Sequence, residues 1–70
     1  MMPLMFANPG DEVIIKKVGG SAENKKNLED LGFVVGGKLT VVNSGNGNLI
    51  VNVKGTRIAI TKEMAGKIMI

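Results

Sequence analysis

The sequence predicts a mainly β domain: a small, strongly bent barrel of about five short strands, with a short helix inserted after the first strand. The chain has only 70 residues, so folding can bury only about 60% of the extended chain's surface, enough for one thin core. Its β-branched residues fall into short runs separated by glycine and asparagine. Cysteine is absent, so no disulfide can support so small a core.

An apolar segment and a first strand are expected at the N-terminal end. The segment 1–8 is too short to cross a membrane, and the sequence leaves open whether it is flexible, folds back or mediates self-association. Residues 11–18 contain four β-branched side chains after a turn signal that ends at Gly10, which predicts a strand. The two aromatic residues, Phe6 and Phe33, are both expected in the core.

A short helix is predicted next. Ser21 can accept a hydrogen bond from a free backbone N–H of the following turn, which indicates a helix over 22–31. Gly32 is expected as the left-handed residue that ends it. Leu28 and Leu31 lie three residues apart on one helix face, so both are expected to contact the core.

The second half is predicted to consist of strands joined by tight turns. Leu49, Val51 and Val53 share one face of an expected strand, whereas Asn52 and Lys54 share the other, as in a strand with one buried face. Strands are expected over 38–43, 49–54, 56–61 and 68–70, with a hairpin loop at 43–48, a turn at Gly55 and a helical turn within 62–67. Gly36 is expected at a further turn. Pairing of the last residues with the first strand would close the barrel.

The composition excludes several kinds of chemistry. Histidine and cysteine are both absent, which removes the usual general base, the strongest nucleophile and the common zinc ligands. We therefore expect no catalytic residue, no bound metal and no cofactor. No apolar stretch reaches the length of a membrane helix, and the N-terminus lacks the basic region of a signal peptide, so a cytoplasmic protein is expected.

Several short motifs occur in a familiar order and spacing. They are Pro-Gly-Asp at 9–11, Leu-Gly-Phe at 31–33 and Gly-Thr-Arg-Ile-Ala-Ile at 55–60. The sequence closely resembles the FeoA family, ferrous iron transport protein A, from about residue 9 to the end. It resembles less closely the C-terminal domain of iron-dependent repressors of the diphtheria-toxin-repressor type. Many FeoA members have proline where this chain has Val35, and a longer loop where it has 44–48.

The resemblance implies an SH3-like barrel and a single domain over residues 1–70. It also implies a small cytosolic adaptor or regulator that binds the cytosolic part of FeoB, the membrane ferrous transporter, and so contacts the membrane only indirectly. The lack of histidine and cysteine agrees with a non-catalytic interaction module rather than an iron carrier. The oligomeric state stays open, a weak homo-oligomer included.

Charged residues are the candidate contacts for such a partner. We select Lys25, Lys26 and Glu29 on the exposed side of the helix, and Arg57, which with Lys54 flanks one turn. An ordinary solvated surface is the competing interpretation of these charges. The net charge of +3 also allows an alternative, a nucleic-acid-associated small basic β-barrel. Two aromatic residues make a poor stacking platform, so nucleic acid is not the expected partner.

Overall fold

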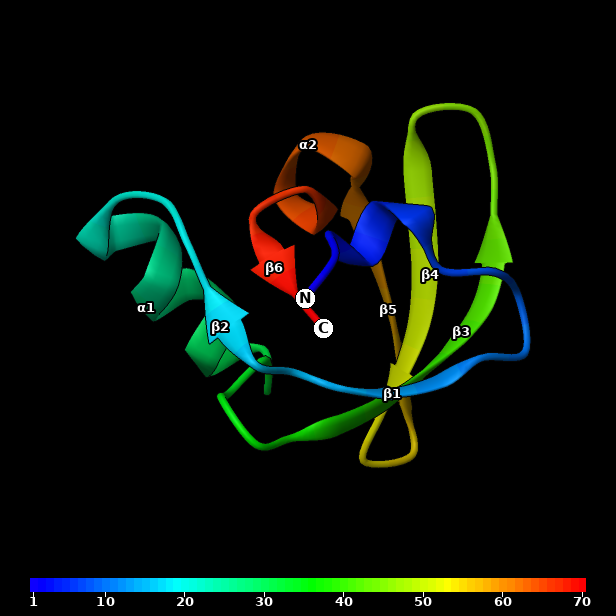
Figure 1. Ribbon diagram of the computed structural model, residues 1–70, viewed down its shortest axis with the longest axis horizontal. Helices are drawn as coiled ribbons and strands as arrows, with labels where there is room; N and C mark the ends of the chain where they lie inside the picture. Colours follow the sequence, from blue (N-terminus) through cyan, green and yellow to red (C-terminus); the bar gives the residue numbers. More distant parts are fainter.

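The computed structural model covers residues 1–70 and is mainly β (Figure 1). Its elements in chain order are η1 (Leu4–Phe6), β1 (Glu12–Ile14), β2 (Lys17–Val18), α1 (Ala22–Asp30), β3 (Lys38–Ser44), β4 (Asn48–Val53), β5 (Thr56–Thr61), α2 (Lys62–Ala65) and β6 (Ile68–Met69). Strands β1, β3, β4 and β5 form one antiparallel sheet in the order β1-β3-β4-β5, and β2 pairs with β6 in a second. The predicted helix after the first strand and the helical turn near the C-terminus are confirmed.

The predicted strand over 11–18 is divided between the two sheets. Its first part, β1, pairs with β3, whereas its last part, β2, pairs with β6. Between them, the Ile15 N–H donates to the Gly37 carbonyl at 2.8 Å, and the Lys16 N–H donates to the Met69 carbonyl at 2.8 Å. The chain thus changes partner at one peptide unit, which gives six strands rather than about five. The predicted pairing of the chain's last residues with its first strand is confirmed.

The N-terminal segment folds back beside the C-terminus, and Figure 1 shows the two chain ends together. The Met2 N–H donates to the Ile70 carbonyl at 3.0 Å, and the Ile70 N–H donates to the Met2 carbonyl at 2.9 Å. Leu4 is fully buried, whereas Phe6 is 64% exposed, so the expectation of a core position for Phe6 is wrong. Successive side chains of a 3-10 helix lie about 120° apart, so η1 can bury only one side chain fully.

Helix α1 begins at the predicted cap and lies almost wholly on the surface. The Ser21 hydroxyl oxygen accepts a hydrogen bond from the Asn24 N–H at 3.2 Å. Leu28 is the only buried residue of the helix, and Asn24, one turn earlier, is half-buried. The helix therefore contacts the barrel along one narrow stripe, and Figure 1 shows it to one side of the sheets.

The end of α1 corrects one core assignment. The Gly32 N–H donates to the Glu29 carbonyl at 2.9 Å. The Phe33 N–H donates to the Leu28 carbonyl at 2.9 Å, which completes a Schellman motif. Gly32 has a φ of +104°, a conformation that glycine adopts without strain. This turn buries Leu28 and Phe33 completely but leaves Leu31 46% exposed, so the expected core position of Leu31 is wrong.

The interior is one apolar cluster shared by both sheets, both α-helices and the N-terminal segment. All 14 buried residues are apolar, so polar chemistry is confined to the surface. Leu49, Val51 and Val53 of β4 all face this cluster, which confirms the predicted alternation. The predicted turn glycines have positive φ angles, at Gly10 (+92°), Gly32 (+104°), Gly36 (+85°) and Gly55 (+82°). Neither helix has the length and apolarity that crossing a bilayer requires.

Candidate functional site

A polar row crosses the outer face of the four-stranded sheet. Glu12 of β1 lies opposite Thr40 of β3, and Thr40 lies opposite Asn52 of β4. Asn52 in turn lies opposite Arg57 of β5. Residues opposite each other in an antiparallel sheet project to the same side, about 5 Å apart. The four side chains therefore form a continuous row on the face turned away from the core, with the carboxylate at one end and the guanidinium at the other.

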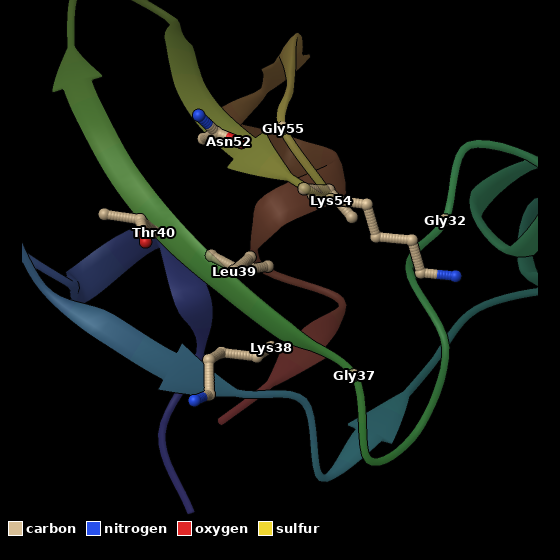
Figure 2. Close-up of a pocket in the computed structure, with 9 residues that line it drawn as sticks. Gly32, Gly37, Lys38, Leu39, Thr40, Asn52, Lys54 and Gly55 are labelled. Carbon is tan, nitrogen blue, oxygen red and sulfur yellow. The ribbon is translucent and has the colours of Figure 1, made fainter.

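The sheet is hollowed beside this row. Figure 2 shows the hollow, which has a volume of about 520 Å³. It is lined by Gly32, Gly37, Lys38, Leu39, Thr40, Asn52, Val53, Lys54 and Gly55. In Figure 2 the Lys54 side chain extends toward the loop that contains Gly32, and the Lys38 side chain projects elsewhere on the rim. The cations and the neutral polar residues of the row and the hollow together are called the basic face: Lys38, Thr40, Asn52, Lys54 and Arg57.

The charge of the basic face is mostly uncompensated. Lys38 Nζ lies 3.4 Å from Glu12 Oε1, and this is the only ion pair of the structure. Lys54 and Arg57 have no carboxylate partner. Counting Glu12, three cations and one carboxylate give this surface a net charge of +2, whereas the whole chain has +3. Exposed cations of this kind can attract an anionic group from another molecule.

Lys54 has an unusual backbone conformation. Val53 pairs with Thr56, so the loop between β4 and β5 contains only Lys54 and Gly55. Their φ angles are +53° and +82°, as a type I′ turn requires. Asparagine, aspartate and glycine are preferred at the first position of such a turn, and Lys54 is the only non-glycine residue here with a positive φ.

The structure divides the charged residues selected from the sequence between two surfaces. Lys25, Lys26 and Glu29 are exposed on α1, whereas Arg57 lies on the basic face. No hydrogen bond or ion pair joins Arg57 to the three helix residues. Their role in binding a partner stays a prediction.

Sequence reasoning placed Lys54 beside Arg57 but missed the other members of the basic face. Lys38, Thr40 and Asn52 come from strands β3 and β4. Their alternation with apolar residues indicates that they point outward, which is a signal available in the sequence. The strand register that aligns them with Arg57 cannot be read from the sequence, because it depends on how the strands pair.

A second surface feature is apolar. The loop after α1 exposes Leu31, Val34 and Val35, which are 46%, 38% and 66% exposed. Neighbouring exposed apolar side chains are common at protein interaction surfaces.

The structure contains no group of three His, Cys, Asp or Glu side chains that is arranged to hold a metal ion.

Comparison with known proteins identifies close relatives. Residues 2–70 match the family model described as the FeoA domain. A Methanocaldococcus jannaschii protein assigned as Fe(2+) transport protein A is 41% identical over 70 residues, which is all of this chain and 85% of that protein. A crystal structure of an Iron Uptake Regulatory Protein (FeoA) is 34% identical with a TM-score of 0.90, covering 97% of this chain and 90% of that chain.

Further structures support the predicted fold. Stenotrophomonas maltophilia FeoA in complex with zinc, described as a prokaryotic SH3 domain protein, is 25% identical with a TM-score of 0.86 over 99% of this chain and 88% of that chain. A manganese-dependent transcriptional repressor has a TM-score of 0.86 at 14% identity over 94% of this chain and 38% of that chain, which shows a shared fold alone. The SH3-like fold is thus confirmed. Because the family model spans nearly the whole chain, and a relative of similar length shares 41% of its residues, this chain belongs to the FeoA family of ferrous iron transport proteins.

Proposed function

We propose that the protein is a non-catalytic adaptor or regulator that binds the cytosolic part of a FeoB-type ferrous iron transporter. Family membership over residues 2–70 is the observation that carries this proposal. The Stenotrophomonas maltophilia relative is described as a possible bacterial ferrous iron transport activating factor, which supports an accessory role. An accessory protein of this kind acts in the cytoplasm, where it meets the transporter's soluble domains.

The distribution of side chains supports binding as the mode of action. Every buried residue is apolar, so the fold has no enclosed polar cavity in which a reaction could be sheltered from water. The surface instead offers exposed charges at Lys25, Lys26 and Glu29 on α1, and at Arg57 on β5. These four residues are our proposed contacts with the transporter.

An NMR titration tests the proposal. The isotope-labelled chain is titrated with the soluble cytosolic part of the FeoB-type transporter from the same organism. We expect amide shifts confined to the exposed side of α1 and to the basic face, where the four proposed contacts lie. Unchanged spectra at high transporter concentrations would contradict binding to the cytosolic part.

Charge reversals then test the individual contacts. Arg57→Glu and Lys26→Glu are each expected to weaken binding, because each replaces an exposed cation by an anion without touching the core. Lys17→Glu, on the other sheet, is the matched control and should leave the affinity unchanged. A variant that binds as tightly as the parent removes its residue from the contact surface, provided that its amide spectrum shows a folded domain.

A further inference from the structure

We propose that the basic face docks an acidic segment of a partner protein, and that Lys54 occupies its left-handed turn position because its charge is required there. This inference rests on the proposed function and deepens it, since it specifies the chemistry of the transporter segment that is bound. The occupant is a short stretch of the partner chain rich in aspartate and glutamate. It would lie over Thr40 and Asn52, with carboxylates directed at Lys54 and Arg57.

The conformation of Lys54 is the first argument. At φ +53° its Cβ is crowded against the following carbonyl, a penalty that glycine avoids and asparagine reduces. The Lys54 side chain makes no hydrogen bond or ion pair that would compensate for this within the domain. A residue that weakens its own turn and gains nothing inside the fold is better explained by a contact outside it.

Charge complementarity is the second argument. Lys54 lines the hollow, and Figure 2 shows its side chain extending toward the loop that contains Gly32. Arg57, opposite Asn52 on the neighbouring strand, ends the polar row. Neither has a carboxylate of its own chain, whereas Lys38 is already paired with Glu12. Asn52 and then Thr40 continue the row from Arg57 and supply neutral hydrogen-bonding groups. An acidic segment would therefore meet unpaired cations and uncharged polar groups, and only one carboxylate.

The same surface is poorly suited to nucleic acid. Binding of single strands relies on aromatic side chains on which bases stack. Phe33 is fully buried, and Phe6 belongs to η1 rather than to the four-stranded sheet. The basic face therefore has cations but no stacking platform, which favours an acidic polypeptide.

The first test uses a hexaglutamate peptide as the probe. It is titrated into the labelled chain at low salt, and an oligonucleotide of matched charge is titrated in parallel. We expect peptide-induced shifts concentrated at Thr40, Asn52 and Arg57, and their loss at high salt because ions screen exposed charges. Equal shifts around all lysines of the chain would overturn the proposal. Tighter binding of the oligonucleotide at the same face would overturn the assignment of a protein partner.

The second test separates the conformational effect of Lys54 from its charge. Lys54→Asn should raise the melting temperature by roughly 2–6 °C, because asparagine suits the left-handed position better. It should also weaken binding of hexaglutamate and of the transporter fragment by at least about threefold, the size expected for one exposed charge pair. Lys17→Asn removes the same charge from the other sheet and should change neither affinity. Unchanged affinity in Lys54→Asn, or a lower melting temperature, would overturn the proposal.

The two tests also separate this inference from the proposed function. If the transporter fragment binds the parent chain and Lys54→Asn equally well, the function stands and the docking surface is wrong. If the fragment does not bind at all, the proposed partner is wrong, and the peptide titration still decides whether the basic face selects acidic segments.

Discussion

Replacement of Leu28 by alanine probes how the helix that carries Lys25, Lys26 and Glu29 is held on the barrel. Leu28 is the only buried residue of α1 and is fully inaccessible to solvent. Beyond it, the helix is joined to the barrel by the chain at each end, with Phe33 entering the core directly after the C-terminal turn. Leu28→Ala should therefore loosen α1 while leaving the four-stranded sheet paired.

The expected cost follows from the burial of Leu28. Truncation to alanine removes three carbon atoms from an inaccessible position, which costs about 2.4 kcal/mol at 0.8 kcal/mol per methylene. Incomplete collapse of the surrounding side chains raises this to about 3 kcal/mol. A 70-residue domain typically has a stability of about 4–10 kcal/mol, so the loss is a large part of the total.

Leu31→Ala is the matched control, because it makes the same chemical change three residues later. Leu31 is 46% exposed, so truncation should cost about 1 kcal/mol. Urea unfolding followed by circular dichroism gives the two changes in free energy of unfolding. Amide hydrogen exchange then reports whether protection is lost from α1 before it is lost from β3, β4 and β5.

The result that refutes this reasoning is equal destabilisation by the two substitutions. Equal costs would mean that both leucines contact the core, as the spacing of the two residues had suggested. A loss below about 1 kcal/mol for Leu28→Ala would mean that α1 is held by its two chain connections rather than by side-chain packing.

Two further predictions concern the turn after α1 and the cap before it. Gly32→Ala should lower the free energy of unfolding by about 1–2 kcal/mol, because a φ of +104° strains an L residue and the added Cβ would lie 3.1 Å from Val53 Cγ1. The control Gly45→Ala lies in open space without a positive φ, so its free energy of unfolding should stay within about 0.5 kcal/mol of the parent's or rise in the same urea titration. Ser21→Ala should cost about 1 kcal/mol by removing the acceptor for the Asn24 N–H, and Ser21→Asp should restore it; an unchanged urea midpoint in Ser21→Ala would contradict a stabilising cap.

Much of the fold could be predicted from local sequence signals. Ser21 and Thr61 accept hydrogen bonds from the N–H groups of Asn24 and Met64, so both helix starts follow from side chains that cap nearby donors. The alternating pattern of β4 follows from the twofold repeat of a strand with one buried face. Family membership could be inferred from short motifs at 9–11, 31–33 and 55–60, and the match over residues 2–70 confirms it.

The tertiary structure alone decided which neighbouring apolar residues are buried. The spacing of Leu28 and Leu31 predicts burial of both residues equally. The turn at Gly32 instead directs Phe33 into the core and leaves Leu31 at the surface. Phe6 is exposed for a related reason, because η1 presents Leu4 to the interior instead. Burial of this kind depends on where the chain goes next, which a repeat along one element does not encode.

The sequence by itself determined the two α-helices with their caps, the strands from residue 38 onward and the outward direction of Thr40, Asn52 and Arg57, because these depend on contacts within a few residues or on strand alternation. Only the tertiary structure decided that these three side chains share one row, and that Lys54 lines the hollow beside this row. Strand register and the change of sheet at Ile15 bring together residues distant in the chain. The basic face is therefore a product of pairing between strands, which no single segment specifies.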